Sequence, residues 1–344
     1  MKKKVTMQDI ADRLNISKNS VSQALTGKPG VSKETRLMVQ KVADELGYSY
    51  PNNRSSQKDD KKGINIALIA SDYAFSLKSF FGEIYLSVEK EVRTRGWNLL
   101  IESIDQDSKD QLILPSLLSN HQIDGILILS HISTDYISKI IDTGIPTVLI
   151  DHHSPYLQAD AILTNNRFGA FKAVEHLIEL GHQDIAFVGD IEISPSYQER
   201  LEGYSLALKK HGIVSNSALL FTDAEETQEE ISRFTDRLPY MPTAWFCVND
   251  GHGFLVQSVL QQKGYKIPED ISICSFDNGQ LSKIATPKIT TVDIDLNYYG
   301  KKAVEQLSWR INHKDEPIHE ILLPTTLIVR ESTAVNTAND IILS

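Results

Sequence analysis

Apolar residues recur at helical spacing from the start of the chain. A first run places Ile10, Ala11 and Leu14 on one helical face. Thr6, with Asp9 three residues later, forms a helix-capping pattern just before that run. We therefore predict a short helix that begins directly after Thr6.

Two further helices are predicted after the first. Asn15 tolerates the left-handed conformation of a tight turn, and Ser17 can cap the second helix. The inward face of this second helix consists of Val21, Ala24 and Leu25. A third helical pattern begins at the cap residue Ser32 and ends at Gly47, a residue type that commonly stops a helix. A helix, a tight turn, a second helix and a supporting helix form the helix-turn-helix arrangement.

The second predicted helix presents polar side chains outward, and these are Ser17, Lys18, Asn19, Ser22 and Gln23. Asn and Gln pair bidentately with adenine in the major groove of DNA, and Lys pairs with guanine. The alternative is a three-helix bundle with a solvated polar face, but a lysine-bearing surface free of carboxylates is uncommon on such a bundle. We therefore predict that residues 1–50 form an all-α DNA-binding domain.

From Ile64 onward, short apolar runs alternate with helical patterns. The predicted strands are 64–71, 97–103, 125–130, 146–151, 184–190, 243–250 and 271–278, and the first four are apolar enough to be buried parallel strands. The helical patterns are 80–96, 110–122, 136–144, 169–182, 200–212 and 253–264. This alternation predicts an α/β body of two doubly wound lobes.

The predicted body covers residues 63–335, after a polar linker at 51–62 and before a tail at 336–344. The segment after Thr290 and the C-terminal apolar run are too short for a third domain, so we expect them to cross back between the lobes. The predicted first lobe is 63–163 plus 292–319. The predicted second lobe is 164–291 plus 320–335.

Charge is distributed unevenly over a chain of ordinary globular composition. Of the 344 residues, 41% are hydrophobic and 23% are charged, and the formal net charge is −10. Residues 1–62 nevertheless contain 13 Lys and Arg against 7 Asp and Glu, whereas the remainder contains 22 against 38. A basic N-terminal segment on an acidic body indicates two partners of different chemistry.

Cysteine usage and hydropathy indicate a cytoplasmic protein. Two cysteines, Cys247 and Cys274, lie in apolar strand-like runs, and we interpret them as reduced core residues. The basic N-terminus has no apolar stretch behind it, so we expect no signal peptide. No run approaches about 18 continuous apolar residues, so we expect no membrane span.

Several enzyme motifs are missing from the sequence. It contains no G-x-G-x-x-G after a strand, no G-x-x-x-x-G-K-[ST] and no G-x-S-x-G. His152 and His153 stand beside Asp151, but no second ligand cluster follows at a spacing suited to a metal. We therefore expect no cofactor and no metal.

The N-terminal segment resembles the LacI family of bacterial transcription regulators. The resemblance rests on VTMQDIADRLNISKNSVSQAL, VSKETR and DELGY. It implies that Lys18, Asn19 and Gln23 read bases. It also implies that Ser17 and Ser22 contact phosphates or bases, and that Thr6 and Ser32 position phosphates. Members of the family usually carry a hinge-helix leucine that wedges into the minor groove, but no leucine occurs between Gly47 and Gly63. We expect this protein to kink DNA less than typical relatives.

The rest of the chain also resembles this family, whose body is similar to the periplasmic sugar-binding proteins. The matching motifs are TNNRFGA, HLIELGH, S-x-S-x-x-x-R-x-x-G-Y, VND, IPEDISICSFDN, TTVD and LIVREST. They occur in the family's order, and with the N-terminal match they cover nearly all of the chain.

Ligands of open α/β lobes bind in the crevice at the carboxyl ends of the strands. Polar residues stand at these strand ends and at one helix start, and aromatic residues nearby could face the C–H groups of a sugar. The predicted ligand site consists of Asp72, Phe80, Phe81, Asp151, Ser194, Arg200, Asn249 and Asp277. The resemblance implies that Arg200 and Asp277 hold the ligand, with help from Asn249. Alternatively, Asn249, Asp250 and Asp277 cap helices, and Arg200 pairs with Glu202 or Asp190 on the surface.

These observations predict a ligand-responsive transcription regulator, a repressor of carbohydrate-utilisation genes. It would be a homodimer on a pseudo-palindromic DNA operator, with a sugar effector between its lobes. A solute-binding receptor without DNA function would need a signal peptide. An enzyme acting on a sugar would need paired acid and base carboxylates, whereas this site mixes amides, carboxylates and an arginine.

Overall fold

A computed structural model describes residues 5–26, 30–46, 48, 63–72, 74, 80–129 and 132–337. The chain falls into two units, Met1–Gly63 and Ile64–Ser344. The predicted linker at 51–62 and most of the predicted tail lie outside the described residues. That this protein kinks DNA less than typical relatives therefore stays a prediction.

The first unit consists of α1 (Met7–Leu14), α2 (Lys18–Thr26) and α3 (Lys33–Leu46). Thr6 and Asp9 form the predicted capping box, and Asn15 adopts the left-handed conformation with φ of 51°. The three helices enclose a small core of Ile10, Ala11, Val21, Ala24, Val39 and Ala43. The predicted helix-turn-helix fold is confirmed, although Gly47, the predicted stop of the third helix, lies outside the described residues.

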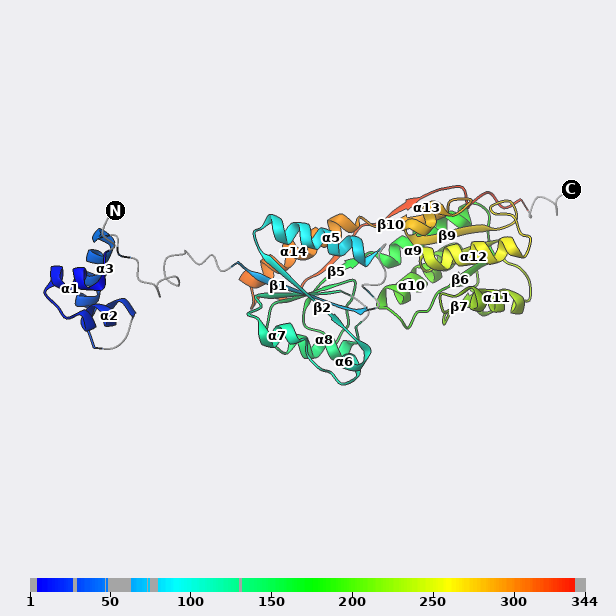
Figure 1. Cartoon of the computed structure of the whole chain (residues 1–344). Coiled ribbons are helices and arrows are strands. Elements are labelled where there is room, and N and C mark those ends of the chain that lie inside the picture. The colour runs from blue at the N-terminus through cyan, green and yellow to red at the C-terminus, as the bar shows by residue number, and fades with distance from the viewer. Residues whose placement is uncertain are drawn as a thin grey trace. The chain divides into compact units, whose positions relative to one another are not determined.

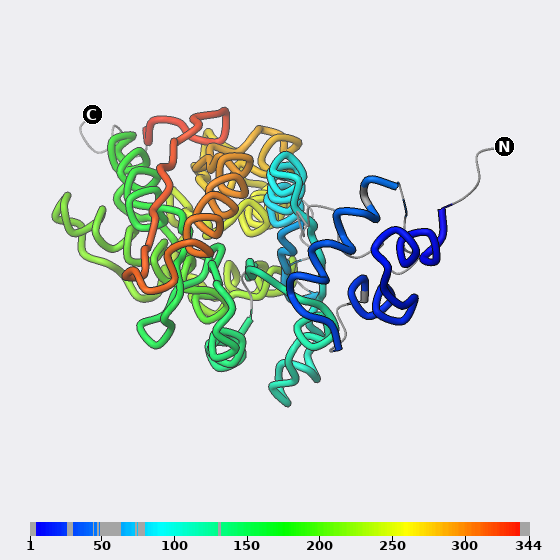
Figure 2. Tube along the Cα trace, turned by 90° about the vertical axis from the view of Figure 1, so that its left-hand side faces the viewer, coloured from blue at the N-terminus to red at the C-terminus, as the bar shows by residue number. Residues whose placement is uncertain are grey.

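The first lobe of the second unit is built on a six-stranded parallel sheet with the order β11-β5-β4-β3-β1-β2. Its strands are β1 (Asn65–Ser71), β2 (Asn98–Ile104), β3 (Gly125–Leu129), β4 (Thr147–Ile150), β5 (Asp160–Thr164) and β11 (Glu320–Leu323). One face packs against α5 (Phe81–Thr94) and α14 (Leu296–Asn312), which lie side by side in Figures 1 and 2. The opposite face packs against α7 (Ser116–Asn120) and α8 (Thr134–Ile141).

The second lobe repeats this plan with the strand order β12-β10-β9-β8-β6-β7. Its strands are β6 (Ile185–Val188), β7 (Leu220–Phe221), β8 (Ala244–Cys247), β9 (Ser272–Asp277), β10 (Thr290–Asp293) and the antiparallel β12 (Thr326–Ile328). One face packs against α9 (Asn166–Glu179) and α10 (Pro195–Lys210), the other against α11 (Gln228–Arg237) and α12 (Asp250–Gln262). Short helices η2 (Ser217–Leu219) and α13 (Gln280–Ile284) complete the lobe. The predicted fold class is confirmed, and both cysteines are free and buried.

Within the described residues the chain crosses between the lobes three times, and all three predicted crossing points are wrong. Thr164 is the last residue of β5, so it belongs to the first lobe rather than the second. β11 pairs in parallel with β5, so Glu320–Leu323 belongs to the first lobe rather than the second. β10 pairs with β9 through Asp293, so residues 292 and 293 belong to the second lobe. Short apolar runs pair with either sheet equally well by hydropathy, and only the backbone hydrogen bonds assign them.

Two local predictions also need correction. The helical pattern at 110–122 is not one helix: α6 (Gln106–Asp110) ends early and α7 starts after Pro115. Proline disfavours a helical residue before it and supplies no backbone donor, and Leu112 takes a left-handed φ of 52°. The run at 97–103 forms the parallel strand β2, but it lies at the sheet edge and is mostly not buried.

Candidate functional sites

The predicted DNA-binding residues of the first unit gather around α2. Lys18 and Asn19 are exposed in its first turn, and Ser22 and Gln23 are half-buried one turn later. The α2–α3 loop returns close to Gln23, because a Cβ atom on Gly30 would lie 2.7 Å from Gln23 Oε1. The freely presented base-reading candidates are therefore Lys18 and Asn19, with Gln23 held at the edge of the same surface.

Three predicted phosphate-contacting hydroxyls act as helix caps. Ser17 Oγ accepts a hydrogen bond from the Ser20 N–H (3.0 Å), and Ser32 Oγ accepts one from the Thr35 N–H (3.1 Å). Thr6 belongs to the capping box of α1. The Thr6 hydroxyl also donates to Asp9 Oδ2, but the hydroxyl hydrogens of Ser17 and Ser32 and the remaining backbone N–H groups of each helix start can still donate to a phosphate.

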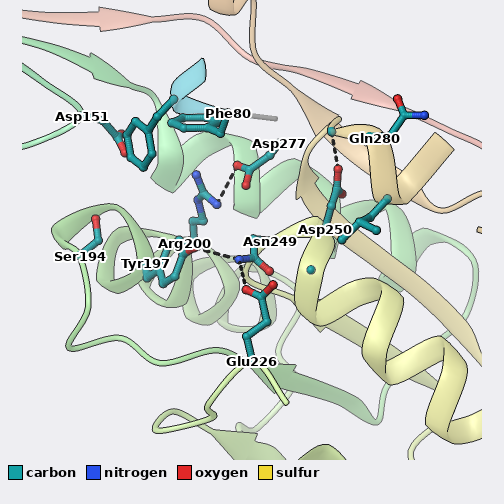
Figure 3. A pocket seen from close by; sticks show the side chains of 14 residues that line it. Phe80, Asp151, Ser194, Tyr197, Arg200, Glu226, Asn249, Asp250, Asp277 and Gln280 are labelled. Carbon is teal, nitrogen blue, oxygen red and sulfur yellow. Dashed lines mark hydrogen bonds and ion pairs between the residues drawn. The ribbon is translucent and has the colours of Figure 1, made fainter. Parts of the chain in front are cut away.

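In the second unit, a pocket opens between the two lobes at the carboxyl ends of their strands (Figure 3). Its cavity volume is about 140 Å³. Seven predicted ligand residues line it, namely Phe80, Phe81, Asp151, Ser194, Arg200, Asn249 and Asp277. Asp72 is not among its lining residues and is exposed.

Arg200 is buried beside the pocket and connects three elements. Its Nε donates to Asn166 Oδ1 (3.0 Å), and its Nη1 donates to the Val248 carbonyl (2.6 Å). Nη1 also lies 3.0 Å from Asp277 Oδ1, an ion pair whose alignment does not make a hydrogen bond. The guanidinium carbon lies 3.8 Å from the ring centroid of Phe276. The alternative of a surface pairing is wrong, because Glu202 pairs with Arg167 instead.

Two pocket aspartates end their strands in left-handed backbone conformations. Asp151 follows β4 with φ of 57°, and Asp277 ends β9 with φ of 101°. Such strain persists where the surrounding structure holds it, and it clusters at functional sites. Burial raises the pKa of Asp151 to about 6, although the Arg200 charge and the hydrogen bond from Ser196 oppose the shift. Burial also raises the pKa of Asp277, again against Arg200.

Asn249 caps a helix and lines the pocket at once. Its Oδ1 accepts the His252 N–H of α12 (2.8 Å). Its Nδ2 donates to Tyr197 Oη and to Glu226 Oε2, both at 2.9 Å. The neighbouring Asp250 is no cap, because its carboxylate ties α12 to the rest of the lobe by accepting hydrogen bonds from Ser275, Thr291 and Gly279. Burial, and then the charge of Asp277, raise the pKa of Asp250 to about 6.

The remaining predicted residues shape the pocket. Ser194 caps α10, its Oγ accepting the Ser196 N–H at 3.2 Å. Phe80 and Phe81 meet edge to face with their ring centroids 4.9 Å apart. Phe81 is buried in the lobe core, and Phe80 packs against that core while half-buried.

Several lining residues were not predicted, chiefly Tyr197, Glu226 and Gln280. Tyr197 precedes Arg200 by three residues on α10, so helical spacing would have found it. Glu226 lies in a carboxylate-rich loop between β7 and α11 that resembles a solvated surface, and no local pattern identifies it.

Comparisons with known proteins agree with this architecture. Residues 6–52 match the model of "Bacterial regulatory proteins, lacI family", and residues 174–333 match a "Periplasmic binding protein-like domain". The chain is 30% identical to the HTH-type transcriptional regulator DegA of Bacillus subtilis over 338 residues, which cover 96% of this chain and 98% of DegA. The chain belongs to the LacI family.

Other LacI-family members show similar identity and similar folds. The ribose operon repressor of Haemophilus influenzae is 30% identical, with 95% of this chain and 98% of the repressor covered. The complex of the regulator CelR with cellobiose superposes with a TM-score of 0.70 at 25% identity, covering 96% of this chain and all of that one. A LacI-family regulator from Enterococcus faecium with bound ribose gives 0.68 at 26% identity, covering 79% of this chain and all of that one.

As a LacI-family protein, this chain is a DNA-binding transcription regulator, and the predicted family is confirmed. Within the described part of the chain, no helix is both long and apolar enough to cross a membrane. The described residues also contain no group of three or more His, Cys, Asp and Glu side chains arranged to hold a metal ion.

Proposed function

We propose that this regulator represses carbohydrate-utilisation genes in the cytoplasm and that a small polyhydroxylated effector in the interlobe pocket controls its binding to DNA. The observation that carries this proposal is the convergence of Arg200, Asp277 and Asn249 with aromatic side chains in a pocket between two lobes. Amides, carboxylates and a guanidinium bind vicinal hydroxyls, and aromatic faces cover sugar C–H groups. The cellobiose and ribose bound by relatives of the same fold support this class of effector.

In this proposal, residues 1–50 read DNA, residues 51–62 link the two modules, and the body binds the effector and dimerises. Two copies of α2, brought together by a homodimer, would grip half-sites about one helical turn apart on a pseudo-palindromic operator. Lys18, Asn19 and Gln23 would contact base edges. An effector that changes the lobe arrangement would need only about 1–3 kcal/mol of coupling to alter DNA binding. The body acts here as a binder and not as an enzyme.

The test is a gel-shift assay with the intact protein on DNA fragments from its own genome, with and without sugars. Removal of residues 1–62 should abolish DNA binding but preserve sugar-induced thermal stabilisation of the remaining unit. Loss of both properties would contradict two independent modules. A full-length protein that binds no fragment would refute the proposal, and turnover of a sugar would favour an enzyme instead.

A further inference from the structure

The interlobe pocket holds more negative than positive charge. Its described lining residues include the carboxyl groups of Asp151, Asp250, Asp277 and Glu226, and Arg200 is the one cationic side chain among them. Arg200 pairs with Asp277. The nearest imidazole is that of His252, whose Nδ1 lies 3.6 Å from Glu226 Oε2, and burial lowers its pKa and so disfavours its charged form. Among the described residues, Asp151, Asp250 and Glu226 therefore form no ion pair with a Lys or Arg side chain.

These three carboxyl groups differ in whether they have an oxygen available to bind a ligand. Asp250 is occupied, since it accepts hydrogen bonds from two hydroxyls and one backbone N–H. Asp151 is only 5% exposed, and Ser196 Oγ donates to its Oδ1 at 2.8 Å. Its second oxygen has no hydrogen-bond partner among the described residues, although Asp151 lines the pocket. The Arg200 charge offsets only part of the cost of burying this carboxylate, and a cationic ligand would relieve the rest.

Glu226 is held at the pocket by a close backbone approach. Its carboxylate lies over the first turn of α12, where a Cβ atom on Gly251 would come within 1.9 Å of Oε1. Any larger residue at position 251 would displace it. Asn249 Nδ2 binds Oε2 at 2.9 Å, which leaves Oε1 without a hydrogen-bond partner among the described residues. The Glu226 side chain is 39% exposed, so it is accessible to a ligand in a way that Asp151 is not.

We propose that the effector is a polyhydroxylated amine of the amino-sugar class, and that its ammonium group pairs with Glu226. This inference rests on the proposed function and narrows its ligand class. Asp151 adds to the negative potential, and the rings of Tyr197 and Phe80, which line the same pocket, offer faces that attract cations. Sugars that carry a phosphate or a carboxylate are repelled, because Arg200, the one cationic side chain among the described lining residues, already pairs with Asp277.

The test compares matched ligands on the full-length protein. Each pair consists of a hexose and its 2-amino-2-deoxy derivative, and the pairs cover the gluco, galacto and manno series. The N-acetyl derivatives serve as uncharged controls and the 6-phosphates as anionic controls. Ring stereochemistry is constant within a pair, so the difference reports the amine. We expect at least one amine to bind about tenfold more tightly than its parent, as a charge-assisted hydrogen bond would provide. The 6-phosphates should not bind.

Substitutions at Glu226, at its neighbour Glu225 and at Gly251 of α12 test whether Glu226 binds the amine. Glu226→Gln keeps an acceptor for Asn249 but removes the charge, and it should lower the ratio of amine to parent affinity about tenfold. Glu225→Gln is the matched control, because Glu225 is an exposed neighbour outside the lining and should leave the ratio unchanged. Gly251→Ala displaces the Glu226 carboxylate without removing it and should reduce the same ratio.

The outcomes separate this inference from the proposed function. Parent hexoses that bind as tightly as their amines, or phosphates that bind more tightly, overturn the amine while leaving a sugar-responsive regulator. A panel in which no amine binds also overturns it. An amine preference that survives Glu226→Gln overturns the assignment to Glu226. Failure of the intact protein to bind DNA, measured separately, refutes the proposed function alone.

Discussion

Replacing Arg200 by Met removes every polar connection that Arg200 makes. The guanidinium joins Asn166 at the start of α9, the Val248 carbonyl after β8 and Asp277 at the end of β9. Met retains an unbranched apolar side chain that fills irregular space, but it has no donor and no charge. The substitution therefore leaves the Asp277 carboxylate, at the edge of the pocket, without its cation.

The expected loss follows from the burial of this pair. The Arg200 side chain is 2% exposed and that of Asp277 is 18% exposed, so solvent screens their attraction poorly. Removal of one partner of a buried pair costs about 3–5 kcal/mol in the free energy of unfolding. Arg167→Met is a matched control on α9, because the Arg167–Glu202 pair is 49% and 42% exposed and such pairs contribute about 0–1 kcal/mol.

The measurement is urea unfolding followed by tryptophan fluorescence. All three tryptophans, Trp97, Trp245 and Trp309, lie in the second unit, so the DNA-reading unit contributes no tryptophan signal. With an m value of about 3 kcal/mol per M, Arg200→Met should lower the midpoint by about 1–1.7 M. Adding Asp277→Asn should restore part of the loss, because it removes the uncompensated charge. Equal small shifts for the Arg200 and Arg167 variants would refute the reasoning.

Three further predictions concern pH, base reading and helix packing. The pKa of Asp151 is raised from 3.8 to about 6, so the folded state binds the proton more tightly than the unfolded state does. The free energy of unfolding should therefore fall by about 2–3 kcal/mol as the pH rises from about 4 to about 6. Asp151→Asn should remove that loss in urea titrations across this range, and a pH-independent difference from the parent would contradict it. Asn19→Ala or Gln23→Ala should each reduce the binding preference for the native base at one or two operator positions by about 1–3 kcal/mol, measured in binding assays on operator variants. If either substitution instead weakens binding to all operator variants equally, the residue contacts only phosphates. Gly203→Ala should lower the melting temperature, because the new Cβ atom would lie 2.1 Å from the Arg167 carbonyl oxygen where α9 packs against α10. An unchanged melting temperature would show that the two helices can separate freely.

Features that depend on residues close together in the chain were predictable from sequence. The Thr6–Asp9 capping box and the left-handed Asn15 rest on local hydrogen bonding and backbone preference. The alternation of strands and helices follows from hydrophobic periodicity. Most of the pocket was predictable for a related reason, since parallel strands bring their carboxyl ends to one edge and residues such as Asp151 and Asn249 stand directly after strands.

Long-range contacts account for what sequence reasoning missed. Which sheet receives β11 depends on backbone pairing with β5, which hydropathy does not encode. Arg200 resembles a surface residue in its acidic neighbourhood, and only the packing of α9, β8 and β9 around it makes it a buried connector.

The chain's own pattern thus determined the helix-turn-helix unit, the α/β body and the strand ends that border the pocket, because short-range periodicity and capping act within a few residues. The tertiary structure alone decided that Glu226 joins the pocket. Its loop lies against Gly251, 25 residues further along the chain, and the absence of a side chain there is what admits the carboxylate. A contact of that kind arises from the folded backbone and leaves no periodic signal in the sequence.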